Sequence, residues 1–224
     1  MHATVLIAGG TARTSLSLRR GAPRTASTLG LRYSVVATAA PLGTGVPRPQ
    51  FGRATLVAFW DDAEAADAGI TGPWSSGEFE GLRIDATAER AIGSWPGVPT
   101  DLPTGPEPLH DGAVLVITIG RLRLLQAPRF FRAGAKAERH ILASPGLTWA
   151  TGLAAPERRT LFTVSWWHDQ AAMDATVRGA GDHRDAMTEQ ARKDFHHESA
   201  FIRFRPVAVR GSLQGKNGVA DLVP

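Results

Sequence analysis

The sequence predicts an α+β fold in which two tandem ferredoxin-like repeats close into an α+β barrel. Strand-like runs recur in the same order in both halves of the chain. The run LGLRYSV (29–35) aligns with PGLTWAT (145–151), and this alignment places LVAFWDDAEAA (56–66) over TVSWWHDQAAM (163–173). A repeated order of strand, helix, strand, strand, helix, strand is the split βαβ unit of ferredoxin-like folds. Because such a sheet leaves one face bare, two sheets close face to face, and we expect the barrel interior to hold the ligand.

The first repeat is expected over residues 1–95 and is degenerate. Apolar, strand-like stretches occupy residues 1–10, 31–41, 53–62 and 82–92. The first expected helix, 11–28, contains Gly21 and Pro23 among Ser, Thr and Arg residues, and the second is interrupted by GITGPW (69–74). Glycine and proline weaken helices, so this half is expected to be a poor copy of the unit.

The second repeat is expected over residues 112–215 and carries the predicted site. Residues 96–111 contain five prolines and are read as an ordered linker, and 216–224 as a tail. Strands are predicted over 113–122, 147–156, 160–169 and 200–209. A helix is predicted over 126–143, where Phe130, Phe131, Ala135 and Ile141 are among the apolar positions and SPG (144–146) ends it.

Composition excludes several classes of protein. The sequence pI is about 10.3, but the net charge is only +4 and the basic residues are dispersed, so nucleic acid is not an expected partner. The chain has no cysteine, which excludes disulfides, iron–sulfur clusters and thiolate-bound haem. No apolar run reaches the roughly 20 residues of a membrane span. The opening stretch lacks the basic flank and cleavage site of a signal peptide, so a cytoplasmic protein is expected.

His183 is the first candidate for a metal ligand. Asp182 can cap a helix with Asp185 three residues on, and His183, Met187, Ala191 and Phe195 would then share one helical stripe. A position in the first turn of a helix disfavours imidazolium, and metals bind neutral imidazole. The alternative is a core or subunit-contact histidine bonded to a backbone carbonyl.

Other histidines and two arginines are weaker candidates. His196 and His197 are expected to end the same helix in DFHHES, where the helix dipole favours the charged form. His168 follows a Trp pair at a strand end and either lines the cavity or occupies a turn. On the last strand Arg203 and Arg205 are expected on one side, where either could bind an anionic group such as a haem propionate or form a rim ion pair. The neighbouring tryptophans, which core packing also explains, are Trp149, Trp166 and Trp167.

The second half resembles a known family. The runs PGLTWATGL, TLFTVSWWHDQAAM, DHR and SAFIRFRPVAVRGSLQG are similar to those of the spheroidene monooxygenase family of carotenoid ketolases. The resemblance implies a haem b protein that uses O₂ and electrons from a donor such as a ferredoxin to oxygenate an apolar substrate, with a homodimer as the expected assembly. It also places His183 on the family's AHR-like histidine, which implies the axial ligand of the haem iron, with His197 and His168 as runners-up.

Two departures from the family pattern affect the expected substrate. Residues 11–25, TARTSLSLRRGAPRT, replace an apolar aromatic helix, and DFHHES replaces an aromatic run. Both argue against a long carotenoid and favour a small hydrophobic molecule. Two other functions stay open. One is a cofactor-free barrel enzyme of the antibiotic-biosynthesis monooxygenase type, in which the barrel shapes and desolvates the substrate. The other is a non-catalytic module that binds haem or a small ligand.

Overall fold

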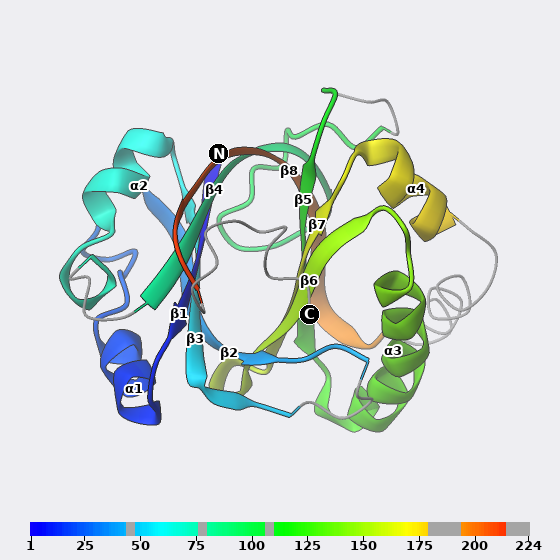
Figure 1. Ribbon diagram of the computed structural model, residues 1–224, viewed down its shortest axis with the longest axis horizontal. Helices are drawn as coiled ribbons and strands as arrows, with labels where there is room; N and C mark the ends of the chain where they lie inside the picture. Colours follow the sequence, from blue (N-terminus) through cyan, green and yellow to red (C-terminus); the bar gives the residue numbers. More distant parts are fainter. Residues whose placement is uncertain (44–47, 76–79, 106–109, 179–193, 214–224) are drawn as a thin grey trace.

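A computed structural model shows a closed antiparallel barrel of eight strands with helices outside it (Figure 1). The structure describes residues 1–43, 48–75, 80–105, 110–178 and 194–213. The first half contains β1 (His2–Gly9), α1 (Ala12–Arg20), β2 (Leu31–Ala40), β3 (Gln50–Trp60), α2 (Ala63–Gly69) and β4 (Glu80–Gly93). The second half contains β5 (Val114–Leu122), α3 (Ala127–Leu142), β6 (Leu147–Ala155), β7 (Thr160–Trp167), α4 (Gln170–Arg178) and β8 (His196–Gly211). Three short 3₁₀ turns are η1 (Gly72–Trp74), η2 (Leu124–Gln126) and η3 (Pro156–Arg158). The predicted tandem ferredoxin-like fold is confirmed.

The barrel is built from two sheets with the same internal order. Around the barrel the strands run β1-β3-β2-β6-β7-β5-β8-β4, so β4-β1-β3-β2 in one half matches β8-β5-β7-β6 in the other. Even the irregularities match, because the bulge between Leu31 and Tyr33 in β2 recurs between Leu147 and Trp149 in β6. The two hairpins predicted to be equivalent are therefore equivalent.

Two seams join the halves, and each seam pairs a strand with its own counterpart. The β4–β8 seam is long and runs from Leu82 opposite Gly211 to Gly93 opposite Ala200. The β2–β6 seam contains only three pairs, from Thr38 opposite Ala154 to Ala40 opposite Gly152. One seam is consequently much weaker in backbone hydrogen bonds than the other.

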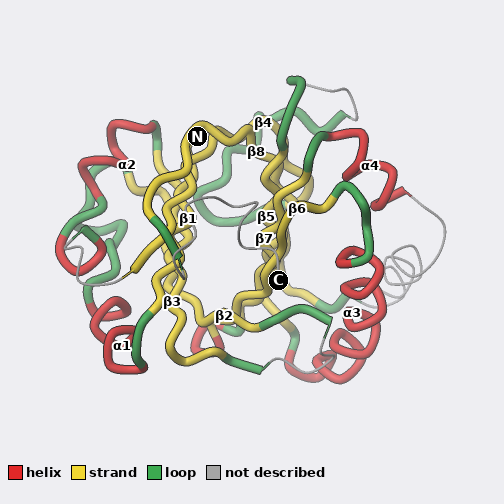
Figure 2. The backbone as a smooth tube through the Cα atoms, in the orientation of Figure 1, coloured by secondary structure: helices red, strands yellow, loops and turns green. Residues whose placement is uncertain are grey.

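The interior of the barrel, enclosed by the strands drawn in yellow in Figure 2, is filled by side chains of both halves. One hydrophobic cluster spans all eight strands, with small side chains such as Ala37 and Ala86 beside large ones such as Phe59 and Phe204. Trp95, at the start of the linker, also lies in this cluster, and Val98 and Leu102 pack against it. The expectation that the interior holds the ligand is wrong, because the inward-facing side chains of both halves pack against each other there.

Helices α1 and α2 cover the outer face of the first half tightly. Leu18 of α1 is 2% exposed, and Trp74 Nε1 donates a hydrogen bond to its carbonyl oxygen at 2.9 Å. α1 starts with a capping box formed by Thr11 and Thr14. Below α1 and α2 lies a second hydrophobic cluster: Leu6, Ala8, Leu18, Leu31, Val36, Ala54, Leu56, Ala58, Trp60, Ala66, Ile70 and Trp74. The half predicted to be degenerate has short helices, but they are well packed.

A buried carboxylate stands on the outer face of β4. Asp85 is 2% exposed, and it accepts a hydrogen bond from Thr4 Oγ1 at 2.9 Å and pairs with Arg83 Nε at 2.8 Å. Burial raises the pKa of Asp85, but His2, Arg83 and Thr4 outweigh that effect and bring the pKa below its usual value. The carboxylate is therefore ionised at neutral pH and paired.

Two sequence predictions near the C-terminal repeat need correction. His196 and His197 do not end a helix; they begin β8, where His196 pairs with Leu122 of β5. Phe195 precedes that strand and packs its ring against Phe130 of α3, so it is not part of a helical stripe. Pairing with β5 overrides the weak strand propensity of DFHHES.

None of the helices in the described residues has the length and hydropathy needed to cross a membrane.

Candidate functional site

The outer faces of the two halves differ at equivalent positions. In the first half, Val36, Leu56 and Leu6 lie opposite each other on β2, β3 and β1. In the second half, the equivalent row on β6, β7 and β5 consists of Gly152, Thr163 and Thr118. The C-terminal sheet has therefore lost three aliphatic side chains beneath its helices.

Burial follows this difference. Leu56 and Leu6 are 0% and 5% exposed beneath α1 and α2. Thr118 is exposed although β5 lies between β7 and β8, and Thr163 beside it is half-buried. Phe201 of β8, opposite Thr118, is also half-buried. We call the surface formed by Thr118, Gly120, Gly152, Thr163 and Phe201 the open sheet face.

Helices α3 and α4 lie over this side of the barrel but bury little against it (Figure 1). Among the described residues, the cluster beneath them has four buried members: Val114, Val116, Trp167 and Met173. α3 is sixteen residues long and amphipathic, yet Ala137 is its only buried residue. Its aromatic residues Phe130 and Phe131 are half-buried. Apolar surface left uncovered in this way is typical of a binding region.

His196 lies at one end of the open sheet face. Its ring stands so close above Gly120 that a Cβ atom on that glycine would lie 2.7 Å from Nε2. The ring centroid is 5.2 Å from that of Phe130, and the two rings are nearly perpendicular. Burial lowers the pKa of His196, and Asp194 opposes this only in part. Among the described residues none hydrogen-bonds to its ring nitrogens, so a neutral imidazole with a free nitrogen faces this region.

Of the histidines predicted as ligands, the structure describes His168 and His197, and both are exposed. His183 lies outside the described residues. His168 is at an exposed turn after β7, where its Nδ1 is 3.0 Å from Asp169, and His197 is exposed on β8. In the described part of the chain, no three histidine or carboxylate side chains gather as a metal site would require.

Arg203 and Arg205 lie on the same side of β8, as their alternation predicts, but this is the outer side, since Ile202 and Phe204 face the interior. Arg203 is buried and pairs with Asp174 of α4 at 2.8 Å. Arg205 is exposed, 3.5 Å from Glu89. The expectation that one of them faces a cavity inside the barrel is corrected, since the interior side of β8 is apolar. Arg203 anchors α4 to the sheet.

The three tryptophans divide between the two faces. Trp149 and Trp166 pack against the barrel core, and Trp167 packs outside, next to Met173 of α4. The Nε1 atom of Trp167 donates to Ser165 Oγ at 2.9 Å. Packing accounts for all three.

Sequence reasoning passed over Thr118 and Thr163 and read His196 only as the end of a helix. A signal for Thr163 was present, because the alignment of the two repeats places it over Leu56. His196 could not be found in this way, since its neighbours Gly120 and Phe130 come from distant segments.

Comparison with known proteins gives the family. No family model matches the chain. A crystal structure of aldoxime dehydratase shares the fold, with a TM-score of 0.58 at 8% identity over 99% of this chain and 87% of that protein. Spheroidene monooxygenase of Rubrivivax gelatinosus is 32% identical over 185 residues, 78% of this chain and 70% of the relative. The Rhodobacter capsulatus spheroidene monooxygenase is 28% identical over 190 residues, 81% and 79% of the two chains.

The tandem α+β barrel and these relatives define the protein as an enzyme of the monooxygenase class. A relative that is 32% identical over 78% of this chain establishes family membership. The chain belongs to the spheroidene monooxygenase family. The suspected resemblance is thereby confirmed.

Proposed function

We propose that the protein is a haem-dependent monooxygenase that acts on a small hydrophobic molecule, with haem b bound against the open sheet face. The observation that carries the proposal is the replacement of Val36, Leu56 and Leu6 by Gly152, Thr163 and Thr118 at equivalent positions. Losing three buried aliphatic side chains costs stability unless something else fills the space. A flat, mainly apolar group suits a sheet face made of glycine and threonine.

The open sheet face and the side chains around it fit such a group. Phe201 of the face, with Phe130 and Phe131 of α3 beside it, offers apolar contacts, and His196 at its end offers a neutral imidazole. His183, which the family resemblance implies as axial ligand, belongs to the segment that joins α4 to Phe195. Bound haem would supply O₂ activation, with electrons from a donor such as a ferredoxin. The protein's own part would be to hold the haem, exclude water and orient the substrate.

The proposed substrate is smaller than the carotenoid for which the relatives are named. This rests on DFHHES, which stands where the family has an aromatic run. His196 of this segment borders the open sheet face, and His197 beside it is exposed. Polar side chains at that edge shorten the apolar surface available to a long polyene.

The test is an absorption spectrum of the protein purified from haem-supplemented cells. We expect a Soret band in the wild type and its loss in His183→Ala. His168→Ala and His197→Ala are matched controls that remove an exposed imidazole and should keep the band. Loss of the band in His196→Ala but not in His183→Ala would move the iron ligand to His196.

Catalysis needs a separate measurement. Oxygen uptake with a reductant and a small hydrophobic substrate should occur only in the haem-loaded protein. Haem binding without turnover would favour a binding module. Turnover by protein with no Soret band would favour the cofactor-free barrel enzyme and contradict the proposal.

A further inference from the structure

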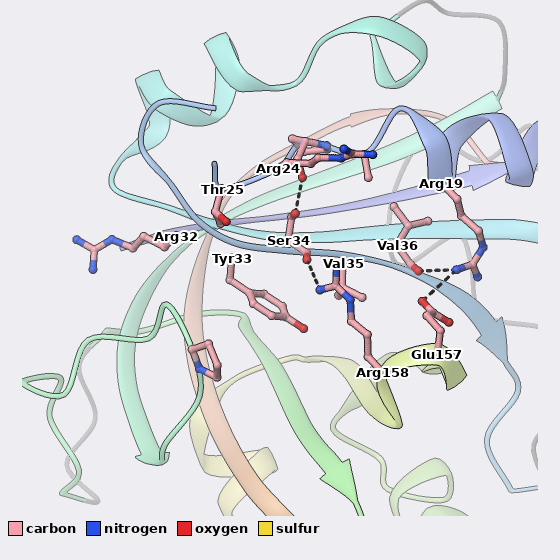
Figure 3. Close-up of a pocket in the computed structure, with 13 residues that line it drawn as sticks. Arg19, Arg24, Thr25, Arg32, Tyr33, Ser34, Val35, Val36, Glu157 and Arg158 are labelled. Atoms are coloured by element: carbon pink, nitrogen blue, oxygen red, sulfur yellow. Dashed lines mark hydrogen bonds and ion pairs between the residues drawn. The ribbon is translucent and has the colours of Figure 1, made fainter. Parts of the chain in front are cut away.

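The weak seam of the barrel leaves backbone groups of β2 without a strand partner on one side. β6 ends at Ala155, and the chain turns into η3 instead of continuing beside β2. Two guanidinium groups pair with β2 where β6 no longer does. Arg158 Nη1 donates to the Ser34 carbonyl oxygen at 3.0 Å, and Arg19 Nη1 donates to that of Val36 at 2.8 Å (Figure 3). The seam therefore depends on arginine side chains from both repeats.

A cavity of about 430 Å³ opens at this point. Its walls come from the connection between α1 and β2, from β2 itself, from η3 and from Pro96 of the linker. That volume is in the range of small-molecule sites. We call it the seam pocket and define it by Arg24, Tyr33, Ser34, Pro96 and Arg158.

The charge of the seam pocket is strongly positive. Four arginines line it against one carboxylate, Glu157. Arg19 is paired with Glu157 at 3.6 Å and Arg32 with Asp61 at 2.6 Å. Arg24 and Arg158 have no carboxylate partner among the described residues. The imbalance begins in the sequence, since the first sixty residues contain seven arginines and neither aspartate nor glutamate. Such a field attracts anions.

Tyr33 adds a hydrogen-bond donor and an apolar wall. The side chain is largely buried, and its hydroxyl end points toward Arg158 (Figure 3). Burial raises the pKa of Tyr33, although Trp95, Arg158 and Arg121 oppose it, so the hydroxyl is protonated at neutral pH. Tyr33 and Pro96 both line the pocket. Guanidinium groups beside an aromatic ring and a proline suit an anion that has an apolar body.

We infer that the seam pocket binds a small organic carboxylate with a compact apolar body, and that the bound anion ties the two repeats together at their weaker seam. The inference is independent of haem, because the pocket lies at β2 and η3 and shares no residue with the open sheet face. Binding to the folded chain alone raises its melting temperature.

Benzoate is the probe, and thermal unfolding of the full-length protein as purified is the readout. At a hundredfold excess over its Kd, benzoate should raise the Tm by about 5 °C or more. Benzyl alcohol, which has the same ring without the charge, should give no shift. Inorganic phosphate, which has charge without the ring, should give a smaller shift than benzoate.

Two arginine variants localise the effect. Arg24→Gln should weaken benzoate binding about fivefold to tenfold by removing an exposed, unpaired cation. Arg20→Gln is the matched control, since Arg20 is exposed nearby on α1 but does not line the pocket. Arg158→Lys should also weaken binding, because lysine keeps the charge and loses the two-pronged donor. Equal shifts with benzyl alcohol or phosphate, equal losses in Arg20→Gln and Arg24→Gln, or no benzoate shift at all would overturn the inference.

Discussion

Thr118→Leu tests directly whether the open sheet face holds the haem. The substitution restores in the C-terminal half the residue that the first half has at Leu6, which is 5% exposed. Fully burying a leucine contributes roughly 1.5–3 kcal/mol. Because Thr118 is exposed, only part of this is available, and we expect the unfolding free energy of the haem-free protein to change by about 1 kcal/mol or less. The same side chain would occupy the surface on which we propose that haem binds.

Haem content and stability should therefore respond in different ways. At a free haem concentration below the wild-type Kd, the Soret absorbance per protein should fall at least about tenfold, equivalent to about 1.4 kcal/mol of binding free energy. Urea unfolding of the haem-free protein should stay nearly unchanged. Thr163→Leu should add to the effect. Thr87→Leu, which makes the same change on the outer face of β4, is the control. A Thr118→Leu protein that binds haem with wild-type affinity would refute the assignment of the face.

Three further predictions concern the barrel itself. Asp85→Asn should lower the unfolding free energy by about 1.5–2 kcal/mol, because Arg83 Nε loses its buried carboxylate partner while Arg83 Nη2 still pairs with Asp67. The folded-state pKa of Asp85 is depressed, so the ionised carboxylate stabilises the fold above the unfolded-state pKa, and this stabilisation is lost as the pH falls through the folded-state pKa. The unfolding free energies measured by urea titration at neutral and at acidic pH should therefore differ less in Asp85→Asn than in the wild type. Tyr33 is the only tyrosine, so the ultraviolet absorbance of its phenolate should appear at higher pH in the folded than in the urea-unfolded protein, and coincident curves would contradict its burial. Phe204→Ala should cost about 3–5 kcal/mol in urea unfolding, and a cost below about 1 kcal/mol would show that the interior is not close-packed.

The fold was predictable because the residues that repeat in the sequence are also residues that fix the pairing register of the strands. Leu31 and Leu147 align in sequence, and both lie opposite a tryptophan at the end of the next strand. The beginning of β8 was not predictable, because histidine, aspartate and glutamate are poor strand formers and only pairing with β5 makes this segment extended.

The site was predictable only in part. The family resemblance predicts a site in the C-terminal repeat, and that site stays a proposal. Alternation correctly put Arg203 and Arg205 on one side of their strand, but the prediction that this side faces the interior was wrong, because Ile202 and Phe204 pack against the other half. The seam pocket could not be predicted from the sequence, because Arg24 and Arg158 are distant in the chain and line one pocket only where β6 turns away from β2.

The matching seams explain why a covalent tandem suits this enzyme. A barrel assembled from two identical chains would carry every substitution twice, so exchanging leucine for threonine beneath one helical layer would also loosen the other. Joining the copies through residues 96–111 removes that restriction. One copy keeps Leu6 and Leu56 buried beneath its helices, while the other carries Thr118 and Thr163 at the equivalent positions, where we propose that the ligand binds. For one half to be fully packed while the other keeps an open sheet face, the two halves must differ in sequence, and a single chain that contains both copies allows this.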